Sequence, residues 1–271
     1  MSVLCVDRKQ FAGAIVSPAA AQQPFTFQPH SFVALRPLRR CIESSAPAPD
    51  PTLSLMPDFK TFLFDLDGTL VDHFAAIHRC HSHTMQKLGL PPPTFEQVHN
   101  AVGGGLELAI RRLVGPDRVA EALAIYRPYW DATMLDDVEL LPGARELLEQ
   151  LHPRGAKLAV LTNKHGPSSR LICEHLKIAP LLSGIFGATD TPWLKPQIEF
   201  TQHALSQLDA TAAETLLIGD STWDVETGRN AGFPVWCVTT GTHTADQLRT
   251  AAPAQVFPNL PTLTQSLAGD A

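Results

Sequence analysis

Two aspartates stand two residues apart, directly after the first strongly apolar segment. Residues 61–64 (Thr-Phe-Leu-Phe) are predicted to form a buried strand, which Asp65, Asp67 and Gly68 follow. Strand residues two apart point the same way, so both carboxylates can meet in the crevice where open parallel sheets bind ligands. Two like charges this close need a compensating cation or proton. The spacing favours a divalent metal at Asp65 and a proton-transfer role for Asp67.

An aspartate–glycine turn with an aspartate helix cap would by itself explain this stretch, but three further polar segments accompany it. The apolar run 158–161 ends in Thr-Asn-Lys at 162–164, and the apolar run 215–218 ends in Gly-Asp-Ser-Thr-Trp-Asp at 219–224. Lys-Pro at 195–196 lies between them. Hydroxyl and amide groups can bind phosphate oxygens, an ammonium supplies positive charge, and a second acidic pair can complete a Mg²⁺ site. Together the four segments predict a phosphate site.

The four segments resemble the four motifs of the haloacid dehalogenase superfamily. They are residues 65–72 (Asp-Leu-Asp-Gly-Thr-Leu-Val-Asp), 161–164, 195–196 and 219–224. Within the superfamily, the chain is most similar to the phosphoglycolate phosphatase-like branch, over roughly residues 57–268. The dehalogenases that name the superfamily lack the second acidic residue of the first motif. Because Asp67 is present here, the resemblance implies phosphate chemistry.

The resemblance also implies a role for each motif residue. Asp65 is the expected nucleophile, and Asp67 is the expected general acid and base. Thr162 and Lys195 are expected to hold the transferring phosphoryl group. The cofactor implied is Mg²⁺, and its expected ligands are oxygens of Asp65, the backbone carbonyl of Asp67, Asp220 and, close by, Asp224.

Such a site needs the metal because a carboxylate is a weak nucleophile that an anionic phosphate monoester repels. Mg²⁺ between the two removes the repulsion and orients the attack. Attack by Asp65 would form an aspartyl-phosphate and divide one hard displacement into two easier ones. Asp67 would protonate the departing alkoxide and then take a proton from water, which requires a pKa above the ~4 of a free aspartate. We expect burial and the neighbouring carboxylates to raise the pKa of Asp67.

The elements that must position these residues alternate between strands and helices. Further short strands are predicted at 184–188 and 234–238, which implies an α/β fold with a Rossmann-like parallel sheet covered on both faces. Residues 74–140 have helical periodicity and lie between the first and second motifs. We expect them to form an inserted helical cap over the crevice, with residues 57–73 and 141–271 as the catalytic core.

Three glycines at 103–105 lie between two predicted helices of this cap. By themselves they predict a flexible loop or a helix cap. The resemblance favours a substrate contact, because cap loops of related phosphatases reach the site. Gly104 is therefore a candidate substrate-binding residue, together with Thr162, Asn163 and Lys195.

Several other side chains could do chemistry, but their spacing is less informative. His78, Cys80, His81 and His83 could be zinc ligands, although on one helix they do not share a face, so an ordinary cap surface is the preferred interpretation. His73 follows the first motif where close relatives often carry a small hydroxyl residue. It marks either a helix start or a substrate contact.

Composition is consistent with a metabolic enzyme. The chain has 271 residues, a net charge of −6 and no basic stripe, so we expect no nucleic-acid partner. Its five cysteines form no Cys-x-x-Cys pair, and no apolar run approaches the ~18 residues of a membrane span. We expect a cytoplasmic monomer or homodimer that acts on a small phosphorylated metabolite, with no membrane partner.

Residues 1–56 differ in texture from the rest and are expected to be a disordered extension, since they are rich in proline and alanine without clear periodicity. Either the true start is Met56, directly before the first strand, or the segment is an organelle-targeting peptide.

The function expected from all of this is Mg²⁺-dependent hydrolysis of a small phosphate monoester, with 2-phosphoglycolate as the first candidate on resemblance alone. Pyrophosphatase, nucleotidase and phosphosugar mutase activity are alternatives within the superfamily. A catalytically silent regulatory protein on the same fold is the alternative from another class, although it would have no evident need for the whole set of motif residues.

Overall fold

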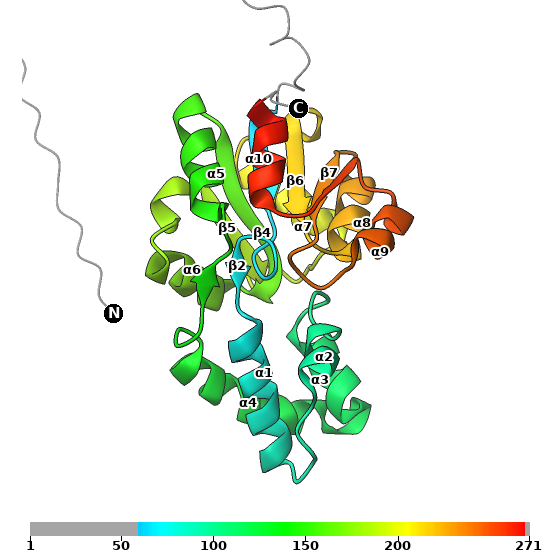
Figure 1. The fold of residues 1–271 in the computed structure, drawn as a ribbon. Coiled ribbons are helices and arrows are strands. Elements are labelled where there is room, and N and C mark those ends of the chain that lie inside the picture. Colours follow the sequence, from blue (N-terminus) through cyan, green and yellow to red (C-terminus); the bar gives the residue numbers. More distant parts are fainter. Residues whose placement is uncertain (1–58, 269–271) are drawn as a thin grey trace, which may run out of the picture. The chain divides into compact units, whose positions relative to one another are not determined.

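A computed structural model describes residues 59–268, without the side chain of residue 268. Its main sheet has six parallel strands in the order β5-β4-β1-β6-β7-β8 (Figure 1). The strands are β1 (Thr61–Phe64), β4 (Lys157–His165), β5 (Gly184–Ala188), β6 (Thr215–Gly219), β7 (Val235–Val238) and β8 (Gln255–Phe257). The sequence predicts the first five of these and misses β8. The expected Rossmann-like α/β fold is confirmed.

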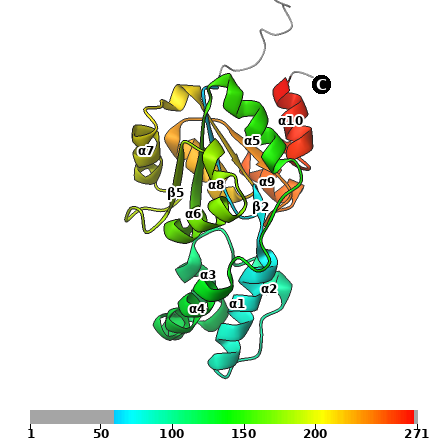
Figure 2. The same ribbon diagram turned by 90° about the vertical axis from the view of Figure 1, so that its left-hand side faces the viewer.

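Alternation along the strands divides the core into two layers. Phe62 and Phe64 of β1 belong to the layer under α5 (Ala144–Leu151), α6 (Gly166–His175) and α10 (Leu260–Ala268). Leu63, between them, faces the layer under α7 (Ile198–Gln207), α8 (Thr222–Ala231) and α9 (Ala245–Ala251). Figure 2 shows helices on both faces of the sheet. All four residues of β1 are buried, as expected for a strand that is covered on both faces.

The central position of β1 brings the motifs together. Thr61 is in register with Lys157 of β4 on one side and with Thr215 of β6 on the other. The carboxyl ends of β1, β4 and β6 therefore lie side by side, and these are the ends that carry the first, second and fourth motifs. This is the switch point where ligands bind in open parallel sheets.

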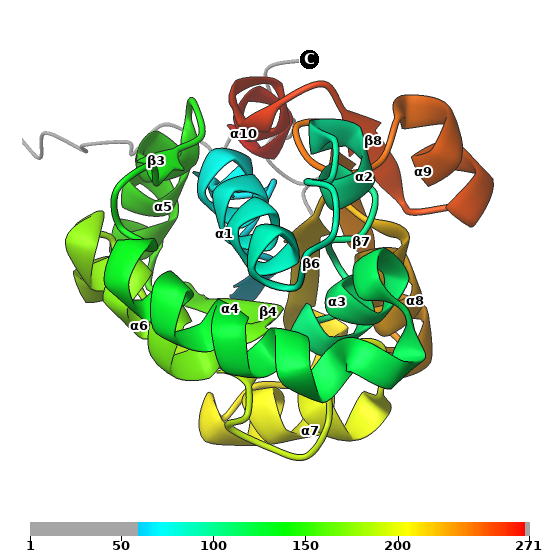
Figure 3. The same cartoon turned by 90° about the horizontal axis from the view of Figure 1, so that it is seen from below.

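Four helices are inserted between β2 (Val71–Asp72) and β3 (Glu139–Leu140), two short strands that pair antiparallel. They lie beyond the carboxyl ends of the sheet strands (Figures 1 and 3). They are α1 (Phe74–Lys87), α2 (Phe95–His99), α3 (Leu106–Val114) and α4 (Val119–Thr133). That residues 74–140 act as a cap domain over a core of 57–73 and 141–271 stays a proposal.

Several expectations concern features away from the motifs. The predicted disordered extension at 1–56 lies outside the described residues. Within 59–268, His78, Cys80, His81 and His83 belong to no cluster that could hold a metal, and Cys80, Cys173 and Cys237 are free and buried. No helix in this part of the chain is long and apolar enough to cross a membrane.

Candidate active site

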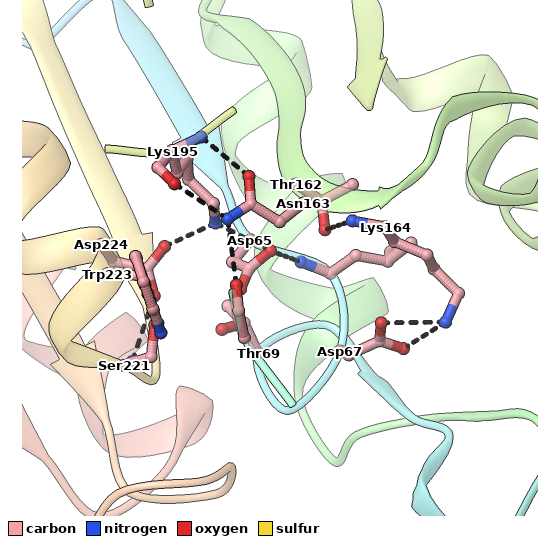
Figure 4. A network of polar contacts seen from close by, with 12 residues as sticks. Asp65, Asp67, Thr69, Thr162, Asn163, Lys164, Lys195, Ser221, Trp223 and Asp224 are labelled. Carbon is pink, nitrogen blue, oxygen red and sulfur yellow. Dashed lines mark hydrogen bonds and ion pairs between the residues drawn. The ribbon is translucent and has the colours of Figure 1, made fainter. Parts of the chain in front are cut away.

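The buried carboxylates of the site are arranged around Lys195. Its Nζ lies 3.0 Å from Asp65 Oδ1 and 2.7 Å from Asp224 Oδ1, as Figure 4 shows. All three side chains are at most 10% exposed. Burial alone would lower the pKa of Lys195, but Asp224 and Asp65 outweigh it and hold the ammonium in its charged form. The predicted lysine is therefore placed between two predicted carboxylates.

A third carboxylate, Asp220, completes an acidic cluster at the end of β6. Oxygens of Asp65, Asp220 and Asp224 lie within 4.8 Å of one another. Burial raises the pKa of Asp65 to about 6, with Lys195 opposing and Asp224 adding to the rise. Burial and the charges of Asp65 and Asp224 raise the pKa of Asp220 well above its usual range.

This cluster fits a divalent metal. Lys195 pairs with two of these three buried carboxylates, Asp65 and Asp224, so negative charge remains uncompensated, and hard oxygens are the ligands that Mg²⁺ prefers. Each ligand is also held by its surroundings. The Thr242 N–H donates to Asp220 Oδ2 at 2.7 Å, and Ser221 donates from its hydroxyl to Asp224 Oδ2 at 2.6 Å. Asp224 also closes a capping box at the start of α8.

Asp67 points away from this cluster and contacts a different lysine (Figure 4). Lys164 Nζ donates to both oxygens of Asp67, at 3.0 and 2.9 Å. His73 is fully buried beside it, with Nδ1 3.5 Å from Asp67 Oδ1. The same histidine contacts the carbonyl of Met134 through Nε2 at 2.6 Å. His73 is the residue directly before α1, at its N-cap position, and its side chain lies against Asp67.

The expected rise in the pKa of Asp67 is wrong for this arrangement. Burial does raise the pKa, but the charge of Lys164 and the contacts of His73 and Lys164 outweigh it and hold the carboxyl well below its usual range. Lys164, for which the sequence indicated no role, is the main cause of the lowered pKa. The raised pKa values belong to Asp65 and Asp220 instead.

Asn163 and Thr162 lie at the end of β4, as predicted, but their hydrogen bonds differ. The Thr162 hydroxyl accepts from the N–H of Lys164 at 3.2 Å and lines the cavity. Asn163 donates through Nδ2 to the carbonyls of Gly103 and Lys195, both at 3.0 Å, and its Oδ1 accepts from the Lys195 N–H at 2.7 Å. Both amide hydrogens of Asn163 are therefore used on the protein backbone. Its predicted contact with substrate stays a prediction.

A cavity of about 120 Å³ lies between the sheet and the inserted helices. The polar side of the cavity, here called the floor, is formed by residues at the strand ends: Asp65, Asp67, Thr162, Lys164 and Asp220. Its roof is mainly apolar and comes from α1, α3 and α4: Ile77, Leu106, Ala109, Tyr126 and Trp130. The cavity thus has a polar side at the strand ends and a mainly apolar side at the inserted helices.

The glycine loop contributes to this cavity through Gly103 and Gly105. Gly104 is not among the lining residues. A Cβ atom on it would lie 2.5 Å from Leu108 and 2.8 Å from Trp223, so the residue packs closely against side chains of α3 and α8. Its predicted substrate contact stays a prediction.

Trp193 and the residues around Lys195 form an ordered loop. Trp193 packs at the edge of the core layer under α7, and Gln197 Oε1 accepts from the Leu194 N–H at 2.9 Å. The bulky Trp193 therefore leaves Lys195 at the site, with its side chain 1% exposed.

Comparison with known proteins agrees with the motifs. Residues 62–238 match the family of haloacid dehalogenase-like hydrolases. A probable phosphatase of Dickeya dadantii is 32% identical over 197 residues, which cover 70% of this chain and 86% of that protein. A phosphoglycolate phosphatase of Pseudomonas fluorescens is 30% identical over 208 residues, which cover 73% of this chain and 76% of that one.

Solved structures give the same result. A haloacid dehalogenase-like hydrolase of Streptococcus pneumoniae superposes with a TM-score of 0.72 at 26% identity, over 78% of this chain and 99% of the other. The chain belongs to the haloacid dehalogenase-like hydrolase family. The resemblance predicted from its four motifs is confirmed.

Proposed function

We propose that the protein is a Mg²⁺-dependent phosphatase that hydrolyses a small phosphate monoester. The observation that carries this proposal is the buried cluster of Asp65, Asp220 and Asp224 around Lys195. Asp65 has the raised pKa of a carboxylate that lacks a sufficient counter-charge. Oxygens of Asp65, Asp220 and the Asp67 carbonyl would hold Mg²⁺, with Asp224 nearby. When bound, the ion would neutralise this negative charge and orient the phosphate.

Asp65 attacks phosphorus in this proposal, and the bond between phosphorus and the leaving oxygen breaks. Water then cleaves the resulting aspartyl-phosphate, which restores the carboxylate and releases phosphate. Lys195 and Thr162 stabilise charge on the transferred oxygens, where fixed donors in a dry site are most effective. Asp67 supplies the proton to the leaving oxygen and recovers one from the attacking water.

Protonation of Asp67 costs free energy, because Lys164 stabilises its carboxylate form. We propose that substrate binding changes this contact before the leaving group departs. The charge of a bound dianionic phosphate would weaken the hold of Lys164 on Asp67, because the ammonium would then be shared between two anions.

The substrate proposed first is 2-phosphoglycolate, because the relative from Pseudomonas fluorescens bears the name phosphoglycolate phosphatase. The volume of about 120 Å³ supports a small organic part, since an apolar cavity of roughly 150 Å³ holds a molecule of the size of benzene. We propose that the protein acts in the cytoplasm as a monomer or homodimer.

The test is Asp65→Asn, which keeps the shape of the side chain but cannot attack phosphorus. A panel of phosphate monoesters assayed with Mg²⁺ should show kcat below ~10⁻³ of the wild-type value. Circular dichroism should show an unchanged fold. Activity retained by a preparation free of wild-type enzyme would exclude the aspartyl-phosphate mechanism, and a wild type that is silent on the whole panel would favour a regulatory protein.

A further inference from the structure

Two adjacent residues at the end of β4, Asn163 and Lys164, contact the inserted helices as well as the floor. Successive side chains of a strand point to opposite sides. Asn163 therefore faces the loop that carries Lys195, whereas Lys164 faces Asp67, as Figure 4 shows. Asn163 thus contacts Lys195, the residue proposed for phosphate binding, and Lys164 contacts Asp67, the residue proposed for proton transfer.

Asn163 is 5% exposed and acts as a bridge between backbone segments. It fixes Lys195 through both the N–H and the carbonyl of that residue, and its second amide hydrogen goes to the carbonyl of Gly103. A side chain that holds the backbone on both sides of the Lys195 Cα fixes where the lysine side chain begins. The same amide ties this lysine to the glycine loop of the roof.

Lys164 forms a similar bridge on the other side. Its side chain is 8% exposed, and its ammonium is shared between the two oxygens of Asp67 and the ring of Trp130 in α4, whose centroid is 4.5 Å away. Trp130 is itself held by a hydrogen bond of 3.2 Å from Nε1 to the Ser168 hydroxyl. The position of Asp67 is therefore coupled to a fixed aromatic ring of the roof.

We infer that Lys164 is a positioning residue for the general acid Asp67 and Asn163 a positioning residue for the phosphate-binding Lys195. The inference rests on the proposed function and adds to it a division of labour between two neighbouring residues. Loss of Lys164 should favour the protonated form of Asp67 but leave its carboxyl without a fixed position, and we expect the lost alignment to outweigh that gain and to lower proton donation to the leaving group. Loss of Asn163 should affect binding of the transferred phosphoryl group, whatever the leaving group is.

The two roles differ in a measurable way because leaving groups differ in their need for a proton. An alkoxide is a poor leaving group and needs one, whereas acetate departs from acetyl phosphate as a stable anion. The value of kcat/KM reports the steps up to the departure of the leaving group. A misplaced acid lowers kcat/KM for an alkyl phosphate alone, and a misplaced Lys195 lowers it for both kinds of substrate.

The experiment compares Lys164→Met with Asn163→Leu, two changes that keep the approximate length or shape of the side chain. The substrates are acetyl phosphate and the best alkyl monoester of a panel, with 2-phosphoglycolate assayed first. For Lys164→Met we expect kcat/KM to fall at least ~10-fold more with the alkyl ester than with acetyl phosphate. For Asn163→Leu we expect losses that agree within about threefold, mainly through KM. Lys164→Arg should recover part of the activity toward the alkyl ester.

Equal losses of Lys164→Met on both substrates, or no loss on either, would overturn the inference. So would a loss of Asn163→Leu confined to the alkyl ester. If Lys164→Met does not fold, as judged by circular dichroism and Tm, the same comparison is made with Lys164→Gln. The Asp65→Asn variant separates the two levels, because its full activity would refute the proposed function, whereas a leaving-group pattern other than the expected one refutes only the assignment of Asn163 and Lys164.

Discussion

The floor and the roof of the cavity are built in contrasting ways. The floor consists mainly of charged side chains with directional contacts. The carboxylates of Asp65, Asp67 and Asp220, and that of Asp224 behind them, each have a lysine, hydroxyl or backbone partner at a defined distance. Roof residues touch mainly through rings and aliphatic groups, as in the stack of Tyr126 on Trp130 with centroids 5.9 Å apart. Directional contacts fix a few atoms for chemistry, whereas non-directional packing defines a shape.

Because of this difference, we expect substitutions in the two regions to have different effects on activity. A change at Asp65, Thr162 or Asp220 of the floor removes a specific charge or hydrogen bond and should affect every substrate. A change in the roof alters a surface and should affect substrates according to their organic part. The contacts of Asn163 and Lys164 are where the two regions meet, and there the effects should mix.

The largest effect is expected for Asp220→Asn in the floor. The amide replaces a charged group that we propose as a Mg²⁺ ligand with a neutral one, so we expect kcat/KM to fall at least ~10³-fold with alkyl and acyl phosphates alike. Isothermal titration with Mg²⁺ should show weaker binding. Ile77→Val in the roof is the matched control and should cost less than about threefold. A loss for Asp220→Asn that depends on the substrate would contradict the expected difference between floor and roof.

Much of the floor could be predicted from sequence because it follows local rules. Asp65, Thr162 and Asp220 each stand after a short apolar run, and parallel strands place such ends together. Lys195 comes from a loop; the sequence included it in the site as a positive charge, and only the family resemblance gave it a role in holding the phosphoryl group. The strand β8 was missed, since Gln255–Phe257 is short and half exposed at the edge of the sheet.

The partners of Asp67 could not be predicted in this way. Lys164 reaches it from β4 and in turn contacts the ring of Trp130 in α4, and this arrangement depends on how the inserted helices pack. The pKa of a buried group follows from such contacts, so its direction was wrong when only the neighbouring carboxylates were considered. Gly104 shows the same limit, because its neighbour Trp223 lies 119 positions further along the chain.

An intermediate effect concerns stability and pH. The pKa of Asp65 is about 6 in the fold against an ordinary value of 3.8. The native state therefore binds more protons than the unfolded state between these values, so stability falls as pH rises from about 4 to about 6. The shift corresponds to roughly 3 kcal/mol for the metal-free protein. The buried His73 and His81 oppose this trend, because burial lowers their pKa values and so makes their contribution to stability rise with pH over the same window. We therefore expect the Tm of the wild type in EDTA, measured relative to that of Asp65→Asn, to be lower at pH 7 than at pH 5.

Mg²⁺ should reverse this trend, since it binds the deprotonated carboxylates. We expect the Tm increase caused by Mg²⁺ to be larger at pH 7 than at pH 5, measured by differential scanning fluorimetry. Asp65→Asn should remove the part of the pH dependence in EDTA that comes from Asp65, whereas Asp220, whose pKa is also raised, keeps a contribution of the same sign. The lowered pKa of Asp67 does not interfere, because its contribution to stability is lost only below about pH 4. A difference in Tm between wild type and Asp65→Asn in EDTA that does not change from pH 5 to pH 7 would contradict the assignment of uncompensated charge to Asp65.

The smallest effect is expected at the roof, for Gly104→Leu. The added side chain must displace Leu108 or Trp223 and so shift the glycine loop whose neighbours, Gly103 and Gly105, line the cavity. We expect kcat/KM for the preferred alkyl monoester to fall about 10-fold, or 1.4 kcal/mol of transition-state binding, with a much smaller change for acetyl phosphate.

A second variant distinguishes displacement of the loop from loss of a direct substrate contact at Gly104. Trp223→Ala removes the larger of the two obstructing side chains, so the double variant Gly104→Leu/Trp223→Ala should be more active than the product of the two single effects predicts. Strict additivity would mean that Gly104 itself touches the substrate. A loss of equal size on both substrates would show that the shift reaches the floor, through the bond from Asn163 to the Gly103 carbonyl, and that the two regions are less independent than their contacts indicate.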